Sequence, residues 1–253
     1  MKASGKASRV SVNFREMDNG YWFVVNGEEK YFPASLMKVH TMVLLLKKEM
    51  MHPGFLDQKV FFDPKLNVPS RNEYHLEPGR TYTVRQLMEY MVKNSDNMST
   101  TLLHDYASLR EMGDFYNEIG LSFPKMQVSE AHQLDDFMQI SEYTKIIRML
   151  YNASYLTKDF SEYALSLLGD THFNLGLTAG LPQGFTASHK YGVWKNNGKT
   201  ELHDCGIIYH QGKAYLLAVM SQGKDEYELA DVIKGISKLV TNRVQNKIVS
   251  KAG

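Results

Sequence analysis

Strand-like patterns fall at both ends of this 253-residue chain and enclose a long helical stretch. Runs that alternate apolar and polar residues, or that are rich in β-branched and aromatic residues, predict strands. These runs cover residues 10–14, 21–25, 186–193, 202–209 and 214–220. A helical stripe over 228–248 follows the last of them. The first two runs, joined by Asp18-Asn19-Gly20, predict a β-hairpin.

The middle of the chain, from about Asp63 to Asp170, has helical periodicity. The patterns Thr83-x-x-Gln86 and Ser108-x-x-Glu111 are capping boxes that mark two helix starts, and Ser141 is expected to cap a third helix. Ahead of this block, residues 35–51 are apolar nearly all round the helical wheel, which predicts a buried helix.

Together these patterns predict an α/β (α+β) fold in which one antiparallel sheet is built from both chain ends and flanked by helices. An all-helical subdomain is inserted between the two halves of the sheet. We group residues 1–60 with 171–253 as the α/β subdomain and assign 61–170 to the helical one. The two form one intergrown unit, with any active site expected at the seam.

Composition narrows the function classes. With 29 Lys+Arg against 28 Asp+Glu the net charge is +1, so no global field attracts a nucleic acid. Cys205 is the single cysteine, which excludes an internal disulfide and leaves no cysteine pair for a zinc site. The longest apolar run, Met42–Leu46, is far below the roughly 20 residues of a membrane span. The N-terminal segment has no signal-peptide centre, so we expect a cytosolic protein or a trimmed targeting segment.

Ser35-Leu-Met-Lys38 opens the predicted buried helix. An i, i+3 spacing puts the hydroxyl and the amine on one face, and a desolvated lysine can accept the proton of a serine nucleophile. The Ser-x-x-Lys pattern also occurs at Ser122 and Ser221, but Phe-Pro and Gln-Gly follow those serines. Only Ser35 stands where such a helix can begin.

Two further elements accompany this pair. The tripeptide Ser95-Asp96-Asn97 follows a predicted helix and is consistent with an N-cap, with a catalytic role, or with both. His189-Lys190-Tyr191-Gly192 lies on the first strand after the helical block. Alone, a lysine on a strand is most simply a solvated side chain.

In this order the three elements resemble those of the penicillin-recognising serine enzymes, in particular the class A β-lactamases and the related D,D-peptidases, over about Val10 to Val240. The resemblance implies that Ser35 is the nucleophile, Lys38 its base, and Ser95 a proton relay to the leaving nitrogen. It further implies substrate-binding roles, listed here: Asn97 for the substrate amide, Lys190 for the substrate carboxylate, with Tyr191 and Gly192 beside it, and the backbone N–H groups of Ser35 and Val193 for the oxyanion hole.

The chain departs from that family pattern at two places. Tyr191 replaces a Thr or Ser whose hydroxyl contacts the substrate carboxylate, so a phenol there is expected to narrow the cleft or move the contact. The loop before Ser141 lacks the Glu-x-x-Leu-Asn motif whose glutamate activates the deacylating water. Glu130 is the nearest substitute, with Asp135 and Asp136 as alternatives; a solvated surface loop is the simpler interpretation of all three carboxylates.

Other residues receive structural interpretations. His40 on the core helix is expected to be a satisfied buried imidazole, and Cys205 a small buried hydrophobe. His203 and Asp204 could contact substrate from the neighbouring strand.

The sequence therefore predicts a serine hydrolase that forms an acyl-enzyme at Ser35 with β-lactams or acyl-D-Ala-D-Ala peptides such as peptidoglycan stem peptides. Deacylation is expected to be slow, as in a D,D-peptidase or penicillin-binding enzyme. One alternative is a true class A β-lactamase that uses Glu130; another is a non-catalytic cell-envelope module. The resemblance implies no metal or organic cofactor and an extracytoplasmic location, and the chain is expected to derive from a membrane-tethered precursor.

Overall fold

A computed structural model describes residues 5–66, 76–122 and 136–252. Contacts divide the chain into two compact units. The sheet unit joins Met1–Ser35, Val128–Arg148 and Phe173–Gly253, and the helical unit joins Leu36–Gln127 and Met149–His172. Both units thus combine stretches that are distant in the sequence.

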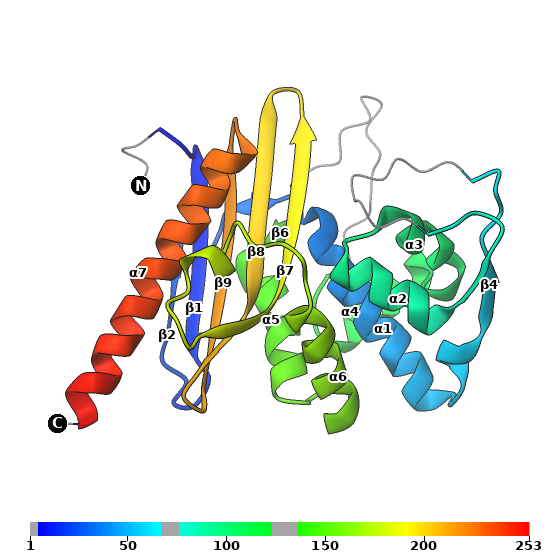
Figure 1. Ribbon diagram of the computed structural model, residues 1–253, viewed down its shortest axis with the longest axis horizontal. Coiled ribbons are helices and arrows are strands. Elements are labelled where there is room, and N and C mark those ends of the chain that lie inside the picture. The colour runs from blue at the N-terminus through cyan, green and yellow to red at the C-terminus, as the bar shows by residue number, and fades with distance from the viewer. Residues whose placement is uncertain (1–4, 67–75, 123–135, 253) are drawn as a thin grey trace. The chain divides into compact units, whose positions relative to one another are not determined.

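The sheet unit is built on a five-stranded antiparallel sheet in the order β2-β1-β9-β8-β7 (Figure 1). Its strands are β1 (Arg9–Glu16), β2 (Trp22–Val25), β7 (Thr186–Asn196), β8 (Lys199–His210) and β9 (Lys213–Gly223). A separate pair joins β3 (Lys30–Tyr31) to β6 (Met138–Gln139). The pairing of β1 with β2 confirms the predicted hairpin, and the pairing of β1 with β9 confirms that both chain ends build one sheet.

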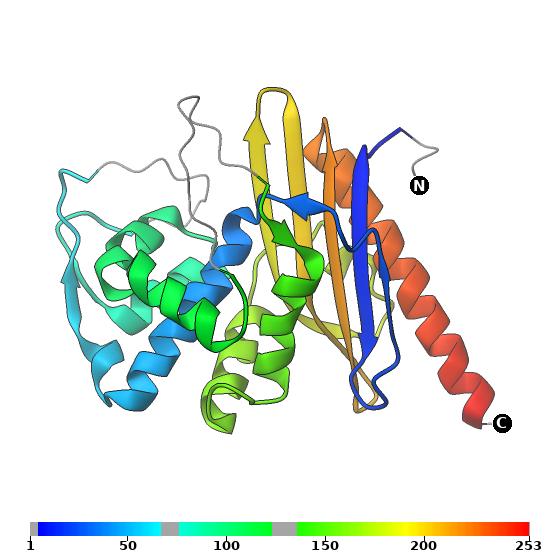
Figure 2. The same ribbon diagram turned by 180° about the vertical axis from the view of Figure 1, so that it is seen from behind.

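Helix α7 (Glu226–Ala252) lies along one face of this sheet, as Figures 1 and 2 show from opposite sides. The Asp225 side chain accepts hydrogen bonds from the N–H groups of Tyr227 and Glu228, which satisfies free donors at the helix start. The buried residues of α7 then recur at helical spacing and pack on the strands; they include Leu229, Val232, Ile233, Ile236 and Val240. Burial of each such side chain contributes roughly 1.5–3 kcal/mol.

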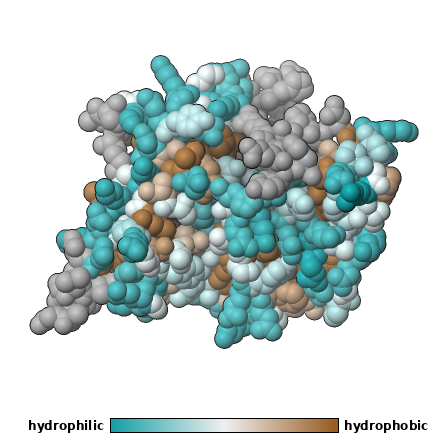
Figure 3. Space-filling model, viewed as in Figure 1, coloured by the Kyte–Doolittle hydropathy of each residue, from teal (hydrophilic) through white to brown (hydrophobic). Residues whose placement is uncertain are grey.

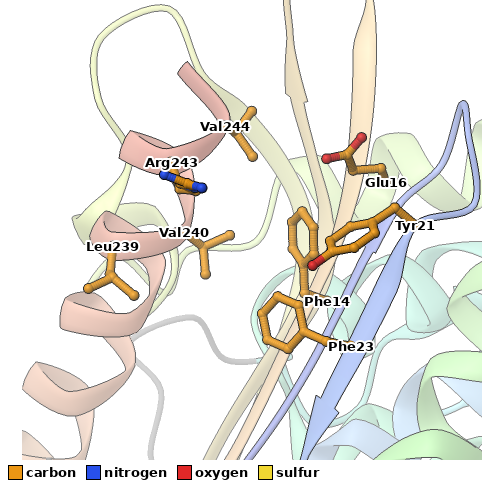
Figure 4. Close-up of a pocket in the computed structure, with 8 residues that line it drawn as sticks. All are labelled: Phe14, Glu16, Tyr21, Phe23, Leu239, Val240, Arg243 and Val244. Atoms are coloured by element: carbon orange, nitrogen blue, oxygen red, sulfur yellow. The ribbon is translucent and has the colours of Figure 1, made fainter. Parts of the chain in front are cut away.

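Toward the C-terminal end of α7 the packing against the sheet opens into a cavity of about 460 Å³ (Figure 4). It is lined by Phe14, Glu16, Tyr21, Phe23, Leu239, Val240, Arg243 and Val244. On the face seen in Figure 3, apolar side chains interrupt the hydrophilic surface along this helix, where Leu239 is exposed. None of the predicted site residues lines this cavity.

The helical unit packs several helices around one buried helix. Its helices are α1 (Met37–Met51), α2 (Val84–Lys93), α3 (Asn97–Leu102), α4 (Leu109–Glu118) and α6 (Lys158–Gly169), with 3₁₀ turns η3 (Phe55–Asp57) and η4 (His104–Tyr106). Helix α1 contacts α2, α4 and α6, and its residues from Lys38 to Leu46 are buried apart from Thr41. Because α1 makes these contacts, residues 36–60 fall in the helical unit, whereas the sequence grouping placed them with the sheet.

Several local expectations can be compared with the structure. Both capping boxes, at Thr83 and Ser108, are confirmed. The inserted region is not all-helical, because β4 (Lys59–Phe61) pairs with β5 (Thr81–Thr83). The β-branched and aromatic run Thr81-Tyr82-Thr83 favours that strand.

The helix cap predicted at Ser141 is wrong, because α5 (Ile140–Tyr151) begins one residue before Ser141. The Glu142 carboxylate accepts a hydrogen bond from the N–H of Gln139, the residue just before the helix. Two 3₁₀ turns complete the description, η2 (Ala34–Leu36) before α1 and η5 (Thr178–Gly180) after α6. No helix in the described ranges has the length and apolar content of a membrane-crossing segment.

Candidate active site

Lys38 lies in the first turn of α1, and its side chain is buried within the helical unit. Its Nζ donates hydrogen bonds to the backbone oxygen of Ser95 and, across 2.8 Å, to Asn97 Oδ1. Ser95 Oγ lies 3.4 Å from the same nitrogen. The structure thus brings together three of the predicted residues, which come from two separate motifs.

Burial controls the charge state of this lysine. Desolvation lowers the pKa of Lys38 to about 8, although the nearby Asp96 carboxylate acts in the opposite direction. A pKa near 8 leaves roughly one-tenth of the amine neutral at pH 7, compared with well under one-thousandth for an ordinary lysine. The amine can therefore accept a proton near neutral pH.

The Ser95-Asp96-Asn97 turn is held by its own hydrogen bonds. Asp96 is the N-cap of α3, where its carboxylate accepts from both the N–H and the hydroxyl of Ser99, each across 2.6 Å. Ser95 has a φ of 54°, in the left-handed region that non-glycine residues rarely adopt. The capping interpretation is therefore confirmed for Asp96, while Ser95 and Asn97 direct oxygens to Lys38 Nζ.

Ser35 occupies the 3₁₀ turn η2 immediately before α1 and is half-buried. The residue before it, Ala34, has a φ of 49°. A left-handed alanine costs on the order of 1 kcal/mol and persists only where its surroundings fix it. The backbone leading into Ser35 is therefore strained.

Lys190 lies on β7 and is fully buried. The ring of Tyr191 stacks on that of Phe173 at a centroid distance of 4.1 Å and packs against the core under α7, and Lys190 Nζ lies over the same ring, 4.5 Å from its centroid. Gly192 and Val193 continue the strand, paired with His203 and Leu202 of β8. Because β7 is the last strand of the sheet order, its outer edge is the place where strand N–H groups can meet a ligand.

The carboxylate of Asp204, considered above for substrate contact, is bonded to other groups of the protein. It is fully buried, its Oδ1 lies 2.7 Å from His189 Nδ1, and its Oδ2 accepts from the N–H of Leu177 across 2.8 Å. These contacts tie β8 to β7 and to the segment before η5. A buried carboxylate with both oxygens bonded has a structural role.

Glu130 and Asp135 lie outside the described residues, so their side chains are not located. Asp136 is described: Arg9 Nη2 contacts it at 2.6 Å, and Lys199 Nζ at 2.8 Å. Asp136 is therefore an ion-pair residue of the sheet unit.

His40 and Cys205 match their structural interpretations. His40 is buried, and its Nδ1 lies 2.7 Å from the Tyr116 hydroxyl. Burial lowers the pKa of His40 to about 3 and raises that of the Cys205 thiol well above its usual value. Both groups are neutral near pH 7.

One buried ionisable residue was not predicted from the sequence. Glu201 of β8 is fully buried, between Lys199 and His203 at alternate positions of the strand. Residues i, i+2 and i+4 of a strand share one face. The sequence signal for this cluster is therefore three ionisable residues at every second position of a strand that is otherwise predicted to lie in the core.

Comparisons with known proteins assign the chain to a family. The sequence model of the "Beta-lactamase enzyme family" matches residues 1–244. A β-lactamase of Bacteroides uniformis is 25% identical over 232 residues, covering 83% of this chain and 78% of its own.

Solved structures share the fold. The structure of PBP-A superposes with a TM-score of 0.80 at 21% identity, covering 94% of this chain and 90% of that one. A β-lactamase of Chitinophaga pinensis superposes with a TM-score of 0.82 at 20% identity over 96% of both chains. The predicted fold class is thereby confirmed. The chain belongs to the beta-lactamase enzyme family, as a serine hydrolase of that class.

Proposed function

We propose that this enzyme forms an acyl-enzyme at Ser35 with β-lactams or acyl-D-Ala-D-Ala peptides and releases the acyl group slowly. The observation that carries the proposal is Lys38: a buried lysine of lowered pKa, one turn after a serine, in contact with Ser95 and Asn97. Catalysis by an activated serine requires such a base.

In the proposed reaction Ser35 Oγ attacks the carbonyl carbon while its proton passes to neutral Lys38. The C–N bond then breaks, and a proton returned through Ser95 neutralises the leaving nitrogen, so that no proton is gained or lost overall. The backbone N–H groups of Ser35 and Val193 stabilise the oxyanion. Asn97 binds the substrate amide, and Lys190, with Tyr191 and Gly192 beside it, faces the substrate carboxylate.

A structure titled as an acyl-enzyme complex of a PBP-A variant with penicillin G supports a β-lactam as the acyl donor. For this chain we extend the substrate class to peptidoglycan stem peptides and the location to the cell envelope, outside the cytoplasm. The alternative, a true β-lactamase that uses Glu130, is favoured by the curated relative named β-lactamase. The two differ only in the rate of deacylation.

Intact-protein mass spectrometry after brief incubation with penicillin G tests the proposal. We expect one covalent adduct with the mass of the intact antibiotic, because ring opening loses no atoms. Ser35→Ala should take up none, and Ser122→Ala is the matched control because it keeps the Ser35 pair and removes another Ser-x-x-Lys serine. An adduct that survives in Ser35→Ala would assign the nucleophile elsewhere.

A further inference from the structure

Phe32 lies three residues before Ser35, and the sheet unit holds its backbone at both polar groups. Its N–H donates to Glu201 Oε2 across 2.9 Å, and its carbonyl oxygen lies 3.0 Å from His203 Nε2. Strand neighbours normally provide such bonds through their backbone, but here two side chains of β8 provide them. We call Glu201 and His203 the Phe32 anchor.

The ring of Phe32 is fixed as well. It contacts the ring of Trp194 at a centroid distance of 4.5 Å and that of Phe137 at 6.2 Å. In addition, the N–H of Phe137 donates to the carbonyl of Tyr31 across 3.2 Å. Phe32 therefore has little freedom to rotate or to slide along β8.

Both members of the anchor are themselves oriented. His203 Nδ1 accepts from the N–H of Ser221 across 3.3 Å, which places the ring proton on Nε2, the atom that donates to Phe32. Glu201 Oε1 accepts from Lys199 Nζ and Gln222 Nε2, each across 2.9 Å, and Arg9 lies 3.4 Å away.

Glu201 is held as a carboxylate in a fully buried position. Burial alone would raise the pKa of Glu201, but the proximity of His203 and of the Lys199 ammonium lowers it overall. Asp136 joins Arg9 and Lys199 from the other side, and Glu29 also pairs with Arg9 across 3.3 Å, so two cations are shared among three carboxylates. A buried charge persists only with such pairing.

This arrangement accounts for the strained residue that follows. Between Phe32 and Ser35 stand only Pro33, whose ring fixes its own φ, and Ala34 at φ 49°. Strain of this kind needs a surrounding structure that does not yield. With Phe32 fixed by the sheet unit, the turn that carries Ser35 is held at its N-terminal end.

We propose that Glu201 and His203 are positioning residues for the reaction of Ser35, acting through the backbone of Phe32. The inference rests on the proposed function, because it concerns acylation at Ser35. Neither residue touches the reacting atoms in this account. A displacement of about 1 Å at a reacting group can cost about 10²-fold in rate.

The test measures penicillin acylation by stopped flow in Glu201→Gln and His203→Ala, with the acylation rate constant separated from the initial binding constant. We expect the rate constant to fall about 10- to 100-fold while the binding constant stays within about 2-fold. His203→Gln, which restores an N–H donor near the position of Nε2, should recover most of the rate. Thr200→Val is the matched control, since it removes a hydrogen bond of the same strand, from Thr200 Oγ1 to the Lys224 carbonyl across 2.9 Å, that neither Glu201 nor Phe32 shares, and it should acylate at the wild-type rate.

Amide hydrogen exchange of the peptide containing Phe32 provides a readout that does not depend on substrate. Exchange should accelerate in Glu201→Gln and stay unchanged in Thr200→Val, with every variant first shown to unfold cooperatively. Normal acylation in both anchor variants, or equal losses in the anchor variants and the control, would overturn the positioning role and leave the proposed function standing. If the wild-type protein takes up no penicillin, the proposed function fails and the positioning role fails with it.

Discussion

Lys38 Nζ donates a hydrogen bond to Asn97 Oδ1 across 2.8 Å, joining the first turn of α1 to the first residue of α3. The contact orients the amine whose pKa burial lowers to about 8. The helical unit therefore both orients the Lys38 amine and lowers its pKa. Its pH dependence can be measured.

The rate of penicillin acylation should rise with pH and level off above about pH 8, because only the neutral form of Lys38 can take the proton of Ser35. Lys38→Met should acylate about 10²- to 10⁴-fold more slowly at pH 7. It should also lose the inflection near pH 8. Stopped-flow acylation between pH 6 and 9.5 measures both effects, and an unchanged inflection in Lys38→Met would assign it to another group.

Much of this site could be predicted from the sequence, because local chemistry sets it. Ser35 and Lys38 are one helical turn apart in the chain, and the capping role of Asp96 depends on Ser99, three residues away. The Phe32 anchor could not be predicted in the same way. It joins Phe32 to Glu201, 169 residues later, and depends on which strand of the sheet lies beside β3.

The fold shows the same division between local and distant information. The hairpin, the capping boxes and α7 follow from periodicity and turn chemistry. The short pairs β3–β6 and β4–β5 join three-residue or two-residue strands, which are too short to show a period of two. The assignment of α1 to the helical unit depends on contacts made by a helix that is apolar on every side, so its sequence names no preferred neighbour.

Lys190→Ala should weaken substrate capture more than it slows the chemical step, since the proposed role of Lys190 is charge complementarity to a carboxylate. We expect the binding constant for penicillin to weaken at least about 10-fold, whereas Lys38→Met should change mainly the acylation rate constant. Lys190 is fully buried, so thermal unfolding must first show that the variant is folded. The same kinetic defect in both variants would contradict the division of roles.

His40 should make the protein sensitive to acid. Its pKa lies near 3 in the folded chain, against an ordinary value of 6.5, because burial penalises the charged form. Between these two values the unfolded chain binds one proton more, so the free energy of unfolding falls as the pH falls, by up to about 1.4 kcal/mol per unit. Urea titrations from pH 7 to 4.5 should show a steeper loss for wild type than for His40→Gln, which keeps a polar partner for Tyr116; parallel curves would contradict the assignment.

The acyl-enzyme should be long-lived. Hydrolysis of a serine ester requires a held water and a base, and the segment that resembles the source of both lacks the Glu-x-x-Leu-Asn motif. Asp136, at the end of that segment, is held in ion pairs with Arg9 and Lys199. Rapid mixing with a chromogenic cephalosporin should therefore give a burst of about one product per enzyme followed by a slow steady state. Glu130→Gln should leave both phases unchanged, whereas turnover of many molecules per second that is lost in Glu130→Gln would make Glu130 the deacylation base and the protein an efficient β-lactamase.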